Sequence, residues 1–156
     1  MNVYIRPLCV KDALKSSHWR NDPEIWAYTS SRPDRYITQD IELEWIRIAL
    51  KNEASKCFAI CILGTDEYIG NAQLTNINNL SAQFHIFIGN KIYWGRGIST
   101  FVTGRVLDFA RNNLNLKKIY LEVNKKNAAA ITSYKKNDFK IISSFDETYK
   151  MEVILK

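Results

Sequence analysis

The pattern of apolar and polar residues divides the chain into short strand-like runs and a few amphipathic stretches. Apolar runs bounded by Gly, Pro, Asn or Asp are typical of strands, and apolar residues three or four positions apart are typical of helices. Turn residues separate the second, third and fourth runs, so we expect an antiparallel meander there. The predicted strands are residues 3–8, 57–63, 68–75, 83–88, 118–123, 139–145 and 148–155.

Helical spacing or a helix-starting residue marks five further stretches. Asp12 and Thr38 are candidate N-caps, and Pro23 suits the first position of a helix. The predicted helices are residues 12–19, 23–28, 38–51, 98–113 and 127–136. The resulting order is a strand, helices, three strands, a helix, a strand, a helix and two strands. This order predicts a domain of mixed helix and sheet.

Composition and charge narrow the class of protein. The chain has 156 residues, 46% hydrophobic and 24% charged, as expected of one globular domain over residues 1–156. The formal net charge of +6 and the pI near 9.2 favour anionic partners such as nucleotides or phosphates. Charged residues interrupt the N-terminal run, and no apolar run approaches the length of a membrane span. We therefore expect a cytoplasmic protein with no membrane partner.

The three cysteines favour packing over chemistry. Cys57 and Cys61 lie four residues apart in one predicted strand, so both should face the same side of it. With Cys9 they make an odd number without metal-ligand spacing. We expect core thiols, a reducing compartment and no metal.

A glycine-containing loop precedes the helix predicted at residue 98. Gly95 and Gly97 allow close approach of the backbone, and the first amides of the helix point outward at the positive end of its dipole. With Arg96 they suit a pyrophosphate, although two glycines before a helix are as often only structural. The spacing fits neither the dinucleotide-binding fingerprint nor the Walker A loop.

Two further residues carry groups suited to proton transfer. Alternation along the strand puts Tyr120, Glu122 and Asn124 on one side, and Tyr134 follows in the next helix. A carboxylate can take a proton from an ammonium group, and a phenol can protonate a departing thiolate. Taken singly, each residue is more often structural: Tyr134 as core packing and Glu122 as a solvated position at the rim of the sheet.

Two segments together resemble the GNAT superfamily of N-acetyltransferases. Trp94-Gly95-Arg96-Gly97-Ile98-Ser99 resembles its pyrophosphate loop, and residues 127–139 resemble its Asn-x-Ala-Ala-x-x-x-Tyr-x-x-x-Gly-Phe segment. The order of elements matches the GNAT fold over nearly the whole chain. The resemblance implies a mixed, mostly antiparallel sheet of about seven strands flanked by about four helices. It also implies acetyl-CoA as co-substrate.

The resemblance assigns roles to individual residues. Tyr134 would be the general acid, and Asn127 would contact the pantetheine arm with its side-chain amide. Main-chain groups of Phe87, Ile88 and Gly89 would pair with that arm like an added strand. The backbone amides that would hold the pyrophosphate are those of Gly95, Arg96, Gly97, Ile98, Ser99 and Thr100.

The identity of the general base stays open between two residues. Leu121-Glu122-Val123 resembles the strand that carries the base in ribosomal-protein alanine acetyltransferases, which favours Glu122. His85 lies in the strand before the loop, and an imidazole with a pKa of about 6.5 also suits the task. A water-mediated route is compatible with either residue.

Three positions depart from the family pattern. Trp94 replaces the usual Gln or Arg, as in the branch that resembles the RimJ/RimL enzymes, and Ser99 replaces a Gly or Ala. Asp138 replaces the glycine before Phe139, and an aspartate tolerates the left-handed conformation that a helix end requires. None of these residues is among the proposed catalytic groups.

The acceptor is predicted from the N-terminal segment. Trp19, Arg20 and Asn21 begin a Trp-Arg-Asn-Asp-Pro sequence that resembles RimL-like enzymes acting on amino sugars of nucleotide carriers, as in the pseudaminic-acid pathway. The residues expected to stack on a ring or to bind a diphosphate are Trp19, Trp26, Tyr28, Tyr36, Arg20, Arg32 and Arg35.

The sequence leaves several acceptors and one other class of function open. We expect a small-molecule amine on an anionic carrier, most of all a nucleotide-linked amino sugar. A protein N-terminus is the alternative, and a polyamine fits worst because the chain is basic. A non-catalytic CoA-binding module is the rival outside enzymology, and we do not expect nucleic acid as the partner. A homodimer is compatible with the sequence.

Overall fold

The computed structural model describes residues 2–29 and 33–156. Seven strands form one sheet in the order β1-β2-β3-β4-β5-β7-β6. All neighbours pair antiparallel except β4 and β5, which pair parallel. The strands are β1 (Val3–Pro7), β2 (Lys56–Ile62), β3 (Tyr68–Thr75), β4 (Ser81–Ile88), β5 (Lys118–Asn124), β6 (Lys140–Phe145) and β7 (Thr148–Ile154).

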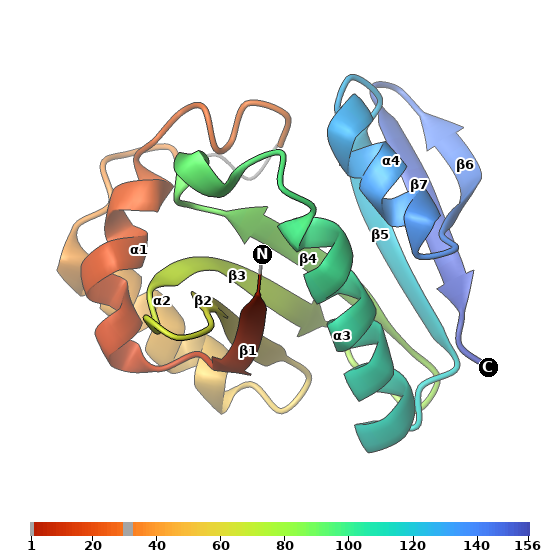
Figure 1. Cartoon of the computed structure of the whole chain (residues 1–156), viewed down its shortest axis with the longest axis horizontal. Coiled ribbons are helices and arrows are strands. Elements are labelled where there is room, and N and C mark those ends of the chain that lie inside the picture. The colour runs from red at the N-terminus through yellow and green to blue at the C-terminus, as the bar shows by residue number, and fades with distance from the viewer. Residues whose placement is uncertain (1, 30–32) are drawn as a thin grey trace.

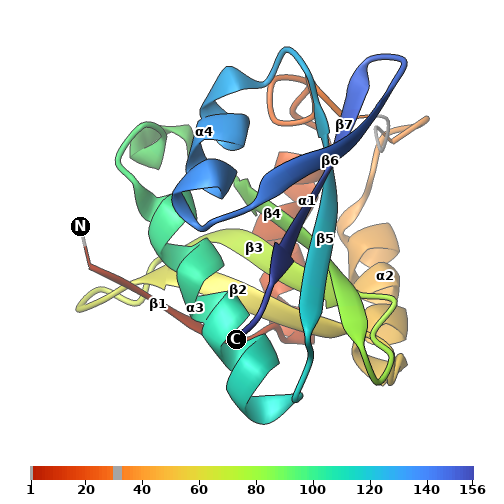
Figure 2. The same cartoon turned by 90° about the vertical axis from the view of Figure 1, so that its right-hand side faces the viewer.

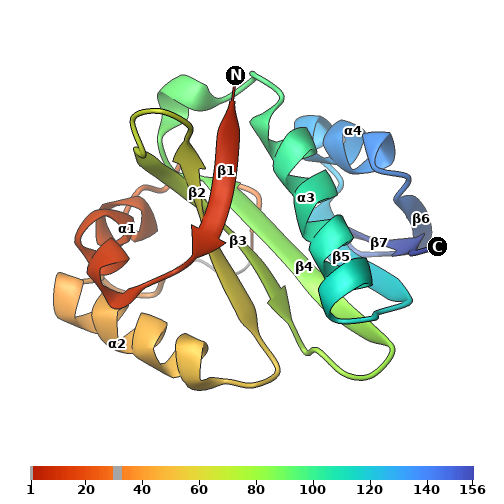
Figure 3. The ribbon, with the colours of Figure 1, turned by 60° about the horizontal axis from the view of Figure 1, so that its bottom comes forward.

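Helices cover both faces of the sheet (Figure 1, Figure 3). The helices are α1 (Ala13–Arg20), α2 (Gln39–Lys51), α3 (Ile98–Asn113) and α4 (Ala128–Lys136), with short 3-10 turns η1 (Val10–Asp12) and η2 (Lys91–Tyr93). One buried cluster joins α3 and α4 to one face, and a smaller cluster joins α1 and α2 to the other. The sheet and the helices confirm the expected fold, including the meander of β2, β3 and β4.

The two cysteines of β2 face the same side of the sheet, as expected. Cys57 and Cys61 are both buried in the smaller cluster, and the three cysteines are free thiols.

Asp138 has a φ of 67° at the end of α4, where its amide donates to the carbonyl oxygen of Lys135. The left-handed conformation expected at this position is therefore present.

One predicted helix is wrong. Residues 23–28 form successive turns. The backbone amide of Ile25 donates a hydrogen bond to the carbonyl oxygen of Asp22, and that of Ala27 donates to the carbonyl oxygen of Glu24. The indole nitrogen of Trp26 donates to the carbonyl oxygen of Trp19, 2.9 Å away, and draws the segment back over α1. Pro23 suits the first position of a helix, but here the contact of Trp26 with Trp19 determines the backbone conformation of residues 23–28.

The two predicted N-caps differ. Thr38 caps α2, since its hydroxyl accepts from the amide of Ile41 at 3.2 Å. Asp12 precedes α1, but its carboxylate binds the guanidinium of Arg6 at 2.8 and 2.9 Å and the amide of Cys9 at 2.9 Å. The Asp12 side chain therefore fixes the turn before the helix and does not cap it.

The sheet opens between β4 and β5. Their ladder holds three pairs, from Ser81 with Lys118 to Gln83 with Tyr120, and beyond it the two strands diverge (Figure 1, Figure 2). Because both strands run in the same direction, the chain leaves them at the open end. There α3 follows β4 and α4 follows β5, so the gap lies beside the N-termini of both helices.

Candidate active site

The loop that joins β4 to α3 has the backbone geometry of an anion site. Gly95 and Gly97 have positive φ, 72° and 78°, a conformation that strains residues with a side chain. No side chain caps α3 at Gly97. Among the residues that the structure describes, none accepts a hydrogen bond from the amides of residues 98–100, at the positive end of this 16-residue helix. These amides can bind phosphate oxygens.

The start of α3 is tied to α4. The Asn137 side chain donates to the carbonyl oxygen of Thr100 at 3.0 Å, and the hydroxyls of Thr100 and Ser133 lie 2.9 Å apart. These contacts join the first turn of α3 to the C-terminal part of α4.

Asn127, which is expected to contact the pantetheine arm, also caps the N-terminus of α4. Its side-chain oxygen accepts from the amide of Ala130 at 3.3 Å and so caps α4. In the described part of the chain, no acceptor lies within hydrogen-bond distance of its amide nitrogen. That nitrogen is the group expected to reach the cofactor.

The edge of β4 is only partly available. The amide of Gly89 donates to the carbonyl oxygen of Ile69 at 2.7 Å, and the carbonyl oxygen of Ile88 accepts from the indole of Trp94 at 2.8 Å. The amide of Gly89 is therefore already paired with β3, and the pairing of main-chain groups of Phe87, Ile88 and Gly89 with the pantetheine arm stays a prediction. Ile88 keeps one lone pair of its carbonyl oxygen.

Tyr134 is a buried phenol without an internal partner. Its side chain is 9% exposed, and its ring packs edge-on against Phe84 and Phe139. Burial raises the pKa of Tyr134 to about 12. Its hydroxyl has no hydrogen bond to any described residue, so it is a neutral donor without a fixed acceptor.

His85 and Glu122 lie across the gap from each other on the opposite face of the sheet from Tyr134. Nε2 of His85 lies 2.9 Å from the hydroxyl of Thr75. Burial lowers the pKa of His85, and the negative charge of Glu122 offsets part of that effect. The imidazole is therefore neutral near pH 7, and Glu122 is close enough for its charge to act on it.

One lysine beside these groups was missed in the sequence. Lys150 pairs with Glu122 in the β5–β7 register, and its ammonium lies 4.9 Å from the centre of the Tyr120 ring. Only the register brings Lys150 opposite Glu122, and a sequence without its strand pairing does not give that register. A positive charge thus lies next to one candidate base.

This combination of glycine loop, opened sheet and buried phenol agrees with comparisons to known proteins. Residues 2–140 match the family model described as an acetyltransferase (GNAT) domain. The chain belongs to this family. The protein is an N-acetyltransferase, and acetyl-CoA is the acetyl donor of the family.

Individual relatives differ in the acceptor that their names state. The spermidine N(1)-acetyltransferase of Escherichia coli K12 is 36% identical over 142 residues, which cover 90% of this chain and 74% of the relative. The acetyltransferase PseH of Campylobacter jejuni is 22% identical over 131 residues, 84% of this chain and 78% of the relative.

Solved structures share the fold. The spermidine N-acetyltransferase of Vibrio cholerae, in complex with CoA and spermine, has a TM-score of 0.87 at 24% identity and covers 98% of this chain and 95% of its own. The comparisons thus establish the GNAT family, and they do not single out the RimJ/RimL-like or amino-sugar branch.

Two of the expected acceptor-binding residues of this GNAT enzyme are structural. Trp19 is 7% exposed, and its ring packs so closely on Gly89 that any side chain at Gly89 would overlap it. Asn21 donates to the carbonyl oxygens of Ser17 and Ile37 and accepts from the amide of Ile37 at 2.7 Å. In this structure the ring of Trp19 is buried, and the polar groups of the Asn21 side chain are paired with main-chain groups.

Arg20 lies beside two tryptophan rings and a small pocket. Its guanidinium lies between the rings of Trp26 and Trp45, 5.3 and 5.4 Å from their centres, and its Nε lies 3.6 Å from the buried carboxylate of Glu42. Arg20 lines a pocket of about 350 Å³ with Asn21, Pro23, Trp26, Pro33, Arg35 and Tyr36. Arg32, also expected to bind a diphosphate, lies outside the described residues.

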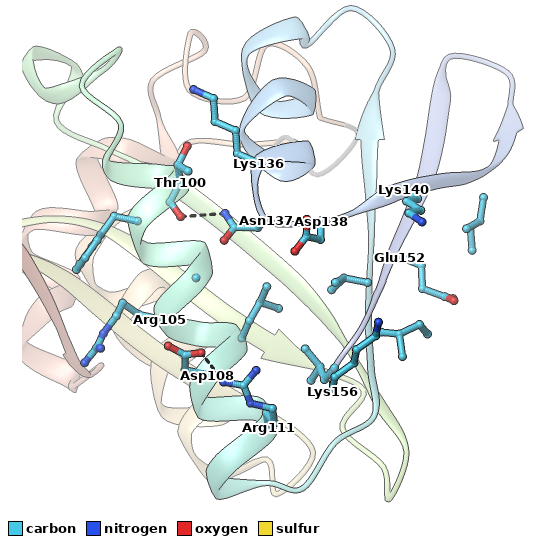
Figure 4. Close-up of a pocket in the computed structure, with 17 residues that line it drawn as sticks. Thr100, Arg105, Asp108, Arg111, Lys136, Asn137, Asp138, Lys140, Glu152 and Lys156 are labelled. Atoms are coloured by element: carbon cyan, nitrogen blue, oxygen red, sulfur yellow. Dashed lines mark hydrogen bonds and ion pairs between the residues drawn. The ribbon is translucent and has the colours of Figure 1, made fainter.

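A larger groove of about 1090 Å³ lies away from these groups, between α3 and the β6–β7 hairpin (Figure 4). Arg105 and Arg111 line it from α3, and Lys140, Glu152 and Lys156 line it from the hairpin. Thr100 is its one residue from the expected cofactor loop, and none of the expected catalytic residues lines it. The groups suited to acetyl transfer therefore lie at the gap between β4 and β5, and not in this groove.

The described residues contain no helix long and apolar enough to cross a membrane. They also contain no group of three His, Cys, Asp or Glu side chains arranged to hold a metal ion.

Proposed function

We propose that acetyl-CoA binds in the gap between β4 and β5, with its pyrophosphate on the amides of residues 95–100. The unpaired helix amides, the positive φ of both glycines and Arg96 support this position. Asn127 and the open edge of β4 border the path from the pyrophosphate toward Tyr134.

In the proposed reaction, the acceptor amine attacks the thioester carbonyl carbon directly. The base first removes a proton from the bound ammonium group, and the amine nitrogen then forms the new bond to the acetyl carbon. The carbon–sulfur bond breaks, and Tyr134 protonates the departing thiolate. A pKa of about 12 keeps Tyr134 protonated until the thiolate forms. Glu122 is the preferred base, with His85 as the alternative.

The acceptor is best described as a primary amine on an anionic carrier, above all an amino sugar linked to a nucleotide. The single observation behind this choice is the pocket that contains Arg20 and Arg35. It also holds Tyr36, which is 71% exposed, and its described lining has no carboxylate. Paired guanidinium groups suit phosphate oxygens, and an exposed phenol ring suits stacking.

The pocket adjoins the gap. Trp26 lines it and packs on Phe87 of β4, with ring centres 5.1 Å apart. A nucleotide in the pocket can therefore extend its amine past Phe87 toward Glu122. Lys150 beside Glu122 adds positive charge on the same path, which disfavours a polycation.

Spermidine is the second candidate, and the 36% identity to a spermidine N(1)-acetyltransferase favours it. A polyamine site needs carboxylates, and the described lining of the arginine pocket contains none. The positive charges of Arg20, Arg35 and Lys150 act against this candidate.

Release of CoA thiol from acetyl-CoA separates these acceptors. We would measure kcat/KM for an amino-sugar nucleotide, for spermidine and for a peptide that starts with Ala. The proposal expects the amino-sugar nucleotide to have the highest value. A higher value for spermidine or for the peptide would replace the anionic carrier with that acceptor.

A further inference from the structure

The short turn η2 connects three parts of the molecule that contribute to the proposed site. It begins at Asn90, whose side chain accepts from the amide of Ile92. The amides of Gly89 and Asn90 both donate to the carbonyl oxygen of Ile69, at 2.7 and 3.1 Å. The turn is therefore fixed to β3 before the chain enters the glycine loop.

One set of contacts runs from η2 toward the glycine loop. The carboxylate of Glu67 accepts from the side chain of Asn90 at 2.9 Å and from the hydroxyl of Tyr93 at 2.8 Å. The guanidinium of Arg96 lies over the Tyr93 ring, 5.6 Å from its centre, and has no carboxylate partner among the described residues. Glu67 thus orients Tyr93, and the Tyr93 ring supports the one cation of the loop.

A second set of contacts runs from η2 toward the segment of turns at residues 22–29. The ammonium of Lys91 lies 2.7 Å from carboxylate oxygens of both Asp22 and Glu24. The hydrogen bond from Lys91 is the main cause that lowers the pKa of Asp22. This segment carries Trp26, which packs on Phe87 and lines the arginine pocket.

The ion pairs of Lys91 with Asp22 and Glu24 are exposed to solvent, which limits their contribution to stability. Lys91 is 40% exposed and Glu24 is 61% exposed, so the ion pairs add little to the stability of the fold. Residues 22–29 form turns and no regular helix, so ion pairs to this segment can still affect its position.

We propose that Lys91 and Glu67 are positioning residues that act on opposite sides of the gap. Lys91 fixes the acceptor-side segment, residues 22–29, and Glu67 fixes Tyr93 and Arg96 of the cofactor loop. Both act through η2, so one turn sets the distance between the two binding regions. This inference rests on the proposed positions of acetyl-CoA and of the acceptor.

The two variants Lys91→Met and Glu67→Gln separate the two actions. Hydrogen exchange of the full chain reports on residues 22–29 and 90–97, and calorimetry reports CoA affinity. Lys91→Met should speed exchange in residues 22–29 about fivefold, with CoA affinity within about twofold of wild type. Glu67→Gln can accept only one of the two hydrogen bonds, so CoA affinity should fall about tenfold while exchange in residues 22–29 stays unchanged.

Two further variants serve as controls. Lys11→Met removes an exposed lysine that has no ion pair among the described residues, so it should change neither readout. Tyr93→Phe keeps the ring under Arg96 but loses the bond to Glu67, so it should reproduce part of the Glu67→Gln effect.

The inference is overturned if Lys91→Met exchanges like Lys11→Met in residues 22–29, or if Glu67→Gln binds CoA like wild type. It is also overturned if both variants change both readouts equally, since that is a general loosening. A wild-type protein without CoA affinity would instead overturn the proposed cofactor site, and the exchange of residues 22–29 would still test Lys91.

Discussion

The two sides of the gap between β4 and β5 differ in the groups that they present to a ligand: backbone groups on one side and side chains on the other. The proposed cofactor side, residues 95–100, consists of backbone amides at a helix N-terminus and of glycines with positive φ. The proposed acceptor side consists of side chains around a small pocket, such as Arg20, Trp26 and Tyr36. The first kind of site imposes local demands on residue type, and the second depends on contacts between segments far apart in the chain. Variants on each side should therefore fail in different ways.

Tyr134 is the proposed general acid, and its loss should have the largest effect. Tyr134→Phe removes a hydroxyl that has no hydrogen bond to a described residue, so the fold should remain intact. We expect kcat to fall about 10²-fold or more, because general acid catalysis is worth about 10²–10⁴-fold. Calorimetry should show CoA affinity near that of wild type. An unchanged kcat on the true acceptor would remove Tyr134 from the mechanism.

The next largest effect should come from the backbone of the cofactor side. A side chain at Gly97 meets no neighbour within 4 Å, so Gly97→Val acts through its φ of 78°. A β-branched residue disfavours that conformation, and we expect CoA affinity to fall at least about tenfold.

Gly64 provides a matched control for this variant. It has a φ of 102°, also meets no neighbour within 4 Å, and lies in the turn between β2 and β3. Gly64→Val should destabilise the fold by a similar amount and leave CoA affinity unchanged. Equal affinities for the two variants would move the pyrophosphate away from the glycine loop.

On the acceptor side the expected effect is smaller and depends on the substrate. Arg20→Met keeps apolar packing on Trp26 and Trp45 but removes the positive charge, so KM for an anionic acceptor should rise about tenfold. KM for spermidine should stay the same or fall. Arg47→Met removes an exposed arginine that pairs with Glu44 and is the control for net charge. Equal KM values for Arg20→Met and Arg47→Met would contradict a phosphate contact at Arg20.

The smallest effect concerns the pH dependence of the proton transfer. A base acts in its unprotonated form, and burial lowers the pKa of His85 below its usual value of about 6.5. A lowered pKa extends the unprotonated form of His85 to lower pH. Between pH 8 and about 6.5, kcat at saturating substrates should therefore fall less than about twofold. A fall centred above pH 6.5 would point to a different base.

These differences explain what the sequence could predict. Gly95, Gly97 and Asp138 all have positive φ, a backbone conformation that restricts the residue type, and at Asp138 it was expected. The alternation on β5 likewise follows from the strand alone. The sequence therefore carries most of the fold and the outline of the cofactor side in local patterns.

The acceptor side was harder to predict for a physical reason. Asn21 looks like a ligand-binding residue until its bonds to Ile37, 16 positions away, are known. The ring of Trp19 is buried because it packs on Gly89, which lies at the far end of β4. The structural roles of Asn21 and Trp19 come from tertiary packing, so the local pattern of apolar and polar residues could not predict them.

The three-pair junction between β4 and β5 also has a consequence for how the chain unfolds. Strands β1 to β4 come from one continuous stretch of sequence and β5 to β7 from another, so each half of the sheet can form from its own neighbouring segments. We expect the two halves to behave as separate cooperative units, with the C-terminal half opening before the whole molecule unfolds. Acetyl-CoA would contact both halves, so its binding would raise the free energy of that partial opening and make unfolding more nearly all-or-none.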